Sequence, residues 1–198
     1  EEPAGQRLAL MEDGRACEAY PGARSPVPAE HQIRGLGPIM MSVPSLRGTD
    51  AILQKAIFMR PVREYAHPEN AKDTVHVYEM GKGGPAAELH VAVQPDLPFT
   101  DPGAGGVHHV AFRTPTFEEH AAWVERLAEL RVPNSGLVDR YYFRSLYFRE
   151  PNGILFEIAS DGPGFAVDED AETLGEKIAL PPFREPRRAE IVANLKAI

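Results

Sequence analysis

The order of apolar runs repeats along the chain, and this repeat limits the folds available to it. The stretch GLGPIMMSVP at residues 35–44 aligns with GVHHVAFRTP at residues 106–115. Each stretch opens with a run typical of a buried strand, and each is followed by apolar residues at helical spacing and then by three strand-like runs. The sequence therefore predicts two βαβββ units, at about residues 35–94 and 106–160.

A helix is predicted after the first strand of each unit. Apolar residues recur on one helical face over residues 45–59 and again over residues 117–130. Thr116 and Glu119 form a T-x-x-E capping box at the start of the second helix. The expected fold class is α+β, with tandem βαβββ units that form a curved mixed sheet or partial barrel.

The remaining segments are interpreted from the same comparison. EPAG at residues 2–5 matches EPNG at residues 150–153. Residues 1–14 are therefore interpreted as the closing strand of a truncated preceding unit, with a strand over residues 6–12. The alternative is that E-P-x-G is common turn chemistry without a repeat. On the favoured interpretation, the chain is the C-terminal part of a longer protein.

These boundaries predict the organisation of the whole chain. A proline-rich linker over residues 15–34 precedes the unit at 35–94. The next unit, with its leading loop, extends over 95–161. An acidic, proline-rich tail over 162–198 is expected to end in a helix near residues 186–195.

Charge and cysteine content exclude several classes of partner. The net charge of −8 argues against nucleic acid and anionic membranes. The single cysteine, Cys17, cannot form a disulfide within the chain and fits a reducing cytoplasm. Because the sequence has no signal peptide and no apolar run near the roughly 18 residues of a membrane span, we expect a cytoplasmic protein.

One histidine and one carboxylate stand out as candidate metal ligands. His109 lies at the head of an apolar run, and Glu157 interrupts another. An unpaired buried carboxylate is very unfavourable, and His plus carboxylate make two-thirds of a facial site for Fe(II) or Mn(II). We expect both side chains on one concave face, at about 2.0–2.2 Å from a shared metal. The alternatives are a hydrogen-bonded His109 at a strand edge and a salt bridge from Glu157 to Arg140.

The other histidines show no pattern of metal ligands. His120 falls on a helix with acidic neighbours, and we expect its side chain to be solvated. The same uneventful interpretation applies to four more: His31, His67, His76 and His90.

Four long stretches of the sequence resemble one known family. They are GVHHVAF (106–112), DRYYFRSLYFREPNG (139–153), FEIASDGPGF (156–165) and TLGEKIALPP (173–182). Together they resemble the vicinal-oxygen-chelate superfamily, and within it the ring-cleaving extradiol dioxygenases of the hydroquinone type. The resemblance implies a protein of four βαβββ units, of which 35–94 is the third and 95–161 the fourth.

The resemblance also implies a set of site residues. Fe(II), with Mn(II) as an alternative, would be held by His109, Glu157 and a third histidine outside this chain. His108 would stand beside the substrate, although strand alternation turns it away from the face of His109. Tyr147 would hydrogen-bond the substrate or oxygen, with a core aromatic as the alternative. Arg140 would lie near the substrate oxygen, with an exposed turn arginine as the alternative.

The function implied is extradiol cleavage of a hydroquinone or catechol ring with O2, as in aromatic compound degradation. One alternative is a glyoxalase-like metal-dependent lyase or isomerase, and another is a non-catalytic module that binds a small molecule. Because the third ligand lies outside this chain, we expect the chain alone to hold metal weakly and to be inactive. We also expect it to form a homo-oligomer that covers its exposed apolar face.

Overall fold

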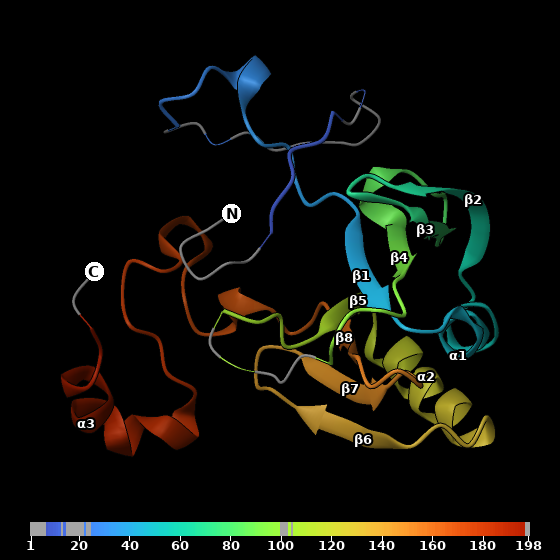
Figure 1. The fold of residues 1–198 in the computed structure, drawn as a ribbon. Coiled ribbons are helices and arrows are strands. Elements are labelled where there is room, and N and C mark those ends of the chain that lie inside the picture. The colour runs from blue at the N-terminus through green and yellow to red at the C-terminus, as the bar shows by residue number, and fades with distance from the viewer. Residues whose placement is uncertain are drawn as a thin grey trace. The chain divides into compact units, whose positions relative to one another are not determined.

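The computed structural model describes residues 7–12, 14, 22, 25–99, 103 and 105–196. Its strands form two four-stranded sheets with matching strand order, β1-β4-β3-β2 and β5-β8-β7-β6 (Figure 1). The strands are β1 (Ile39–Val43), β2 (Arg60–His67), β3 (Asn70–Glu79), β4 (Glu88–Val93), β5 (Val110–Thr114), β6 (Asn134–Asp139), β7 (Arg144–Arg149) and β8 (Leu155–Ser160). The predicted α+β fold with two βαβββ units is confirmed, and within the described chain neither sheet closes into a barrel.

Each unit places one helix between its first and second strands. The helices are α1 (Leu46–Ala51), α2 (Phe117–Glu129) and, in the tail, α3 (Arg188–Ala193). The helix predicted over residues 45–59 is present, and α1 continues from Ala51 into a π-helical turn, Ile52–Ala56. Phe58 then takes a positive φ of 58° and ends the helix. No helix among the described residues is long and apolar enough to cross a membrane.

The chain divides into two compact units. Unit 1 comprises Glu1–Val110 together with Arg149–Leu155, and unit 2 comprises Ala111–Phe148 together with Phe156–Ile198. The sheet β1-β4-β3-β2 belongs to unit 1. The sheet β5-β8-β7-β6 gives unit 2 its strands and is accompanied by α2.

In unit 1, one sheet face packs against α1 and the other carries a polar cluster. The hydroxyl of Tyr78 on β3 donates to Asp50 of α1 at 2.7 Å, so Tyr78 faces the helix. Its neighbour Val77 therefore points to the opposite face. Strand register pairs Val77 with Arg63 on one side and His90 on the other. Those two polar residues consequently lie on the helix-free face of this sheet.

The turn after β7 also belongs to unit 1 and packs on α1. Thr49 donates to the buried carboxylate of Glu150 at 2.6 Å, and the Asn152 amide donates to the Ser45 carbonyl at 3.0 Å. Gly48 permits this approach, because a Cβ there would lie 2.6 Å from the Cβ of Pro151. The EPNG motif thus forms a turn whose carboxylate is satisfied by neutral donors.

Unit 2 repeats the arrangement of helix and sheet. The Arg144 guanidinium of β7 lies 3.8 Å from the ring centroid of Phe117 in α2. Alternation places Leu146 and Phe148 on this helix-covered face, where both are buried. Ser145 and Tyr147 therefore point to the helix-free face. The predicted cap of α2 is confirmed, since the Thr116 hydroxyl accepts a hydrogen bond from the backbone of Glu119.

Two other predictions of strands need correction. Residues 7–12, the described part of the strand predicted at 6–12, form no strand, because they have no ladder partner here. Residues 1–6, and all of the linker residues 15–24 except residue 22, lie outside the described residues. The strand predicted to start at residue 106 starts at Val110, so His108 and His109 precede it. In the tail, α3 falls within the predicted helix at 186–195.

Candidate active site

Glu157 is a buried carboxylate on the helix-free face of unit 2. Its residue is only 3% exposed, and it lies between the fully apolar Phe156 and Ile158 on β8. The Ser145 hydroxyl on the neighbouring strand β7 donates to its Oε1 at 2.5 Å. Ser145 is itself fully buried, so this hydrogen bond is shielded from water.

The hydrogen-bond chain continues outward from Ser145 to an arginine. Tyr147 Oη donates to Ser145 Oγ at 3.3 Å. Arg140 donates to Tyr147 Oη from Nη2 at 3.1 Å and from Nε at 3.3 Å. The Arg140 Cζ also lies 5.2 Å from the centroid of the Tyr147 ring. Since arginine only donates and an ionised carboxylate only accepts, the chain is directed from Arg140 to Glu157.

This series of hydrogen bonds links three predicted site residues through one residue that the sequence analysis missed. Arg140, Tyr147 and Glu157 were predicted, while Ser145 was passed over within the stretch RSLYF. Strand alternation could have identified Ser145, because it places Ser145 on the same face of β7 as Tyr147. What the sequence could not give was the register that sets Ser145 against Glu157.

The two adjacent histidines form a close pair of their own in unit 1. The Nδ1 atoms of His108 and His109 are 2.9 Å apart, and the two rings meet nearly edge to face with centroids 5.2 Å apart. His108 is exposed and His109 is half-buried. Because both precede β5, strand alternation does not separate them, which removes the geometric objection to a shared role.

The donor types present suit a divalent metal of the Fe(II) kind. An imidazole and a hydrogen-bonded, buried carboxylate are two of the three groups of a facial site. His109 belongs to unit 1 and Glu157 to unit 2, so their predicted pairing stays a prediction. Among the described residues, no three His, Cys, Asp or Glu side chains gather where they could hold a metal.

Two histidines that the sequence analysis set aside are not solvated. His120 in α2 is fully buried, and its two ring nitrogens find no hydrogen-bond partner within the described chain. Burial lowers the pKa of His120, opposed by the nearby Ile158 backbone and reinforced by the Arg144 cation. His90 is also buried, and it bonds Tyr65 and Glu88. The prediction that His120 is solvated, made from its acidic neighbours, was wrong.

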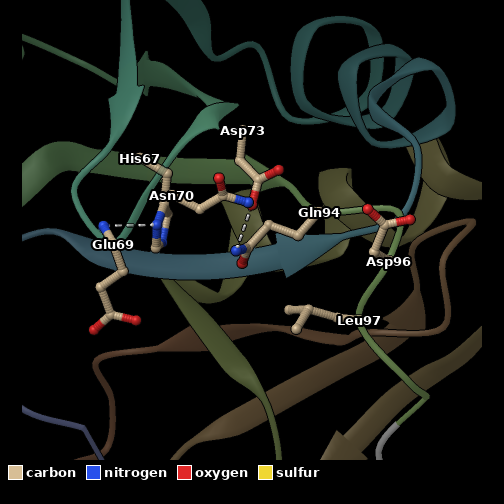
Figure 2. A pocket seen from close by; sticks show the side chains of 7 residues that line it. All are labelled: His67, Glu69, Asn70, Asp73, Gln94, Asp96 and Leu97. Carbon is tan, nitrogen blue, oxygen red and sulfur yellow. Dashed lines mark hydrogen bonds between the residues drawn. The ribbon is translucent and has the colours of Figure 1, made fainter.

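A separate polar pocket of about 240 Å³ opens at the end of the β2–β3 hairpin in unit 1 (Figure 2). Asp73 is one of its lining residues, and its Oδ2 accepts from the Asn70 amide at 3.1 Å and the Gln94 amide at 3.0 Å. His67 accepts from the backbone of Glu69 through Nδ1. The lining is therefore largely paired within itself.

The fold agrees with a family comparison. A model of the glyoxalase/bleomycin resistance protein/dioxygenase superfamily matches residues 35–158, and the chain belongs to that superfamily. A crystal structure described as a "putative dioxygenase" from Bacillus subtilis subsp. subtilis strain 168 superposes with a TM-score of 0.79 at 31% identity. That similarity covers 91% of this chain and 55% of the other.

Two curated relatives carry names that indicate a reaction. The chain is 47% identical over 197 residues to "Putative ring-cleaving dioxygenase MhqA" of Bacillus subtilis strain 168, covering 98% of this chain and 61% of MhqA. It is 30% identical over 177 residues to chlorohydroquinone/hydroquinone 1,2-dioxygenase of Sphingobium indicum, covering 85% of this chain and 51% of that enzyme. The chain thus spans less than two thirds of either relative.

Proposed function

We propose that this chain forms the metal- and substrate-binding part of a ring-cleaving dioxygenase. Its substrate would be a hydroquinone- or catechol-type ring, opened with O2 in the extradiol manner. The observation that carries the proposal is the buried Glu157 with its directed chain of donors. It is supported by the similarity to proteins named as ring-cleaving and hydroquinone dioxygenases.

His109 and Glu157 would hold Fe(II), together with one histidine from outside this chain; Mn(II) is the alternative metal. When bound, the metal supplies Lewis acidity toward a phenol oxygen and an electron path between the ring and O2. Ser145 fixes one oxygen of Glu157, which favours a single orientation of the carboxylate. Such supporting hydrogen bonds tune metal affinity by about 10–100-fold.

Tyr147 and Arg140 would act on the substrate oxygens. Arg140 donates two hydrogen bonds to Tyr147 Oη, so negative charge that develops near this oxygen meets a cation. The Tyr147 hydroxyl donates its proton to Ser145 in this structure, and it could donate that proton to a substrate oxygen instead. His108, in contact with His109, would donate or accept a proton beside the same ligand.

Oxygen uptake with hydroquinone tests the function. Longer protein that includes the first of the expected four units, loaded anaerobically with Fe(II), should consume O2 and yield a ring-opened product, whereas its Zn(II)- or Ni(II)-loaded form should not. Activity on a hemithioacetal with Zn(II) or Ni(II), without O2 uptake, would favour the glyoxalase-like lyase. Hydroquinone binding without metal or turnover would favour the binding module.

A second comparison tests whether a ligand is missing from this chain. The 198-residue chain alone should hold Fe(II) weakly, show no appreciable O2 uptake and self-associate in sedimentation velocity runs. Protein that includes the first of the expected four units should bind iron and turn over. Comparable turnover by both would contradict a third ligand outside the chain.

A further inference from the structure

A second polar cluster occupies the helix-free face of the other sheet. It consists of Arg63 and Tyr65 on β2 and Glu88 and His90 on β4. Arg63 pairs with both carboxylate oxygens of Glu88 at 2.6 and 2.7 Å. Glu88 Oε2 lies 2.8 Å from His90 Nε2, and His90 Nδ1 lies 2.8 Å from Tyr65 Oη.

This cluster stands where unit 2 carries its candidate ligand. Strands β4 and β8 both have six residues and occupy the same place in their sheets. Alignment of the two strands end to end sets His90 opposite Glu157, and the buried Leu89 opposite the buried Phe156. Both sites lie on the face turned away from the helix of their own unit.

The hydrogen bonds of the cluster follow one order of donors and acceptors. This order determines what the Tyr65 hydroxyl, at the outer end of the cluster, can bind. The Arg63 guanidinium holds the pKa of Glu88 at about 2, so the carboxylate is ionised and only accepts. With the imidazole neutral, His90 Nε2 must then carry the proton and Nδ1 must accept. Tyr65 must donate to Nδ1, which leaves the lone pairs of Tyr65 Oη to accept from a ligand. Burial raises the pKa of Tyr65, so the phenol keeps its proton.

Stability alone does not account for this arrangement. Glu88 and His90 side chains are each only 8% exposed, over a floor of fully buried Val75 and Val77. An ion pair with one half-exposed partner adds little to the stability of a fold. Tyr65 as a residue is half-buried, so it is not sealed from solvent.

The surroundings favour a neutral aromatic ligand. Arg63 and Glu88 cancel in charge, so the site has no net attraction for an ion. Met40 on β1 pairs in register with His90 and is 45% exposed, which offers a soft apolar surface beside the imidazole. We propose that Tyr65, His90 and Met40 form a second small-molecule site that takes a neutral phenol, whose O–H donates to Tyr65 Oη. This proposal is independent of the metal chemistry of Glu157.

The test uses the metal-free chain and two probes that differ only in the donor. Para-fluorophenol and para-fluoroanisole are titrated into the protein, and binding is followed by fluorine NMR. The titration is made at about pH 8, because an ordinary imidazole is neutral there. The chain should bind the phenol about fivefold more tightly than the anisole, as expected for one neutral hydrogen bond. Phenol should also shift the His90 imidazole nitrogen resonances, which at rest should show a protonated Nε2.

Variants locate the effect. Tyr65→Phe keeps the ring and should abolish the preference for phenol over anisole. Tyr142→Phe is the matched control, since Tyr142 is also a half-buried tyrosine whose hydroxyl bonds one carboxylate, Asp168. Equal binding of the two probes by the unaltered chain would overturn the proposal without any variant. So would a preference for phenol that survives in folded Tyr65→Phe protein.

Discussion

The helix-free faces of the two sheets share a framework and differ in how a buried carboxylate is compensated. In unit 1, both oxygens of Glu88 pair with Arg63, so its charge is cancelled within the protein. In unit 2, Glu157 receives a hydrogen bond from the neutral Ser145, and the cation Arg140 lies two hydroxyls away. A carboxylate already paired with an arginine at both oxygens is a poor metal ligand, so Glu88 is the weaker candidate of the two. The hydrogen-bond partners described at each carboxylate, more than the fold, distinguish the two faces.

The largest effect should come from removing the charge of Glu157. In the longer protein that includes the first unit, Glu157→Gln keeps the shape and the bond from Ser145, but lowers Fe(II) affinity and O2 uptake at least about 100-fold, more than loss of a supporting residue would. Asp161→Asn is the matched control, because it removes an exposed acid paired with Arg113 on the same unit. Iron analysis and an oxygen electrode give the measurement. Undiminished iron content in Glu157→Gln would break the comparison.

Ser145→Ala should produce the next largest effect. It removes the donor to Glu157 Oε1, so Fe(II) affinity should fall about 10–100-fold while the ligand itself remains. Stability should also fall by about 1–3 kcal/mol, since a buried acceptor loses one of its hydrogen bonds. Calorimetric metal titration and urea unfolding separate the two losses. Ser135→Ala on β6, whose hydroxyl lies on an exposed strand, should leave metal affinity unchanged.

Acid should affect the Glu88 face through its lowered pKa. The folded pKa of about 2 lies below the ordinary 4.5, so the unfolded chain binds more protons between these values. The stabilisation is complete above pH 4.5 and is lost as pH falls toward 2. Because Arg63 is half-exposed, we expect about 1–2 kcal/mol. Glu88→Gln should flatten this part of the stability curve in urea unfolding; an unchanged acid slope would argue against the Arg63 pair.

His120 should give the smallest effect, and it serves as a reference outside both faces. Its lowered pKa means that stability is complete above pH 6.5 and declines as pH falls below this value. His120→Leu should remove that decline and raise stability by about 1 kcal/mol, because two unpaired buried nitrogens disappear. Melting temperatures between pH 5 and 8 measure it. A variant that keeps the wild-type acid slope would show that another group titrates.

The sequence by itself determined the helices and strands, and it singled out Glu157 as a carboxylate within an apolar strand. Periods of two and of about 3.6 residues gave the two βαβββ units, and T-x-x-E gave the cap at Thr116, because these signals depend on neighbours within one turn or strand. Glu157 stood out because a carboxylate inside an apolar run needs compensation. Alternation also assigned Tyr147 to the face opposite Leu146 and Phe148.

Only the tertiary structure decided which side chains meet. Alternation indicates the face of a strand but not its register, so Ser145 beside Glu157, twelve residues apart, could not be inferred. The same holds for Tyr65 and His90, whose contact spans 25 residues across an intervening strand. His120 was misjudged because charged neighbours along a helix do not reveal which side packs on the sheet. Strand register and helix packing depend on hydrogen bonds and burial between residues that are far apart in the sequence. A local stretch of sequence therefore does not determine them.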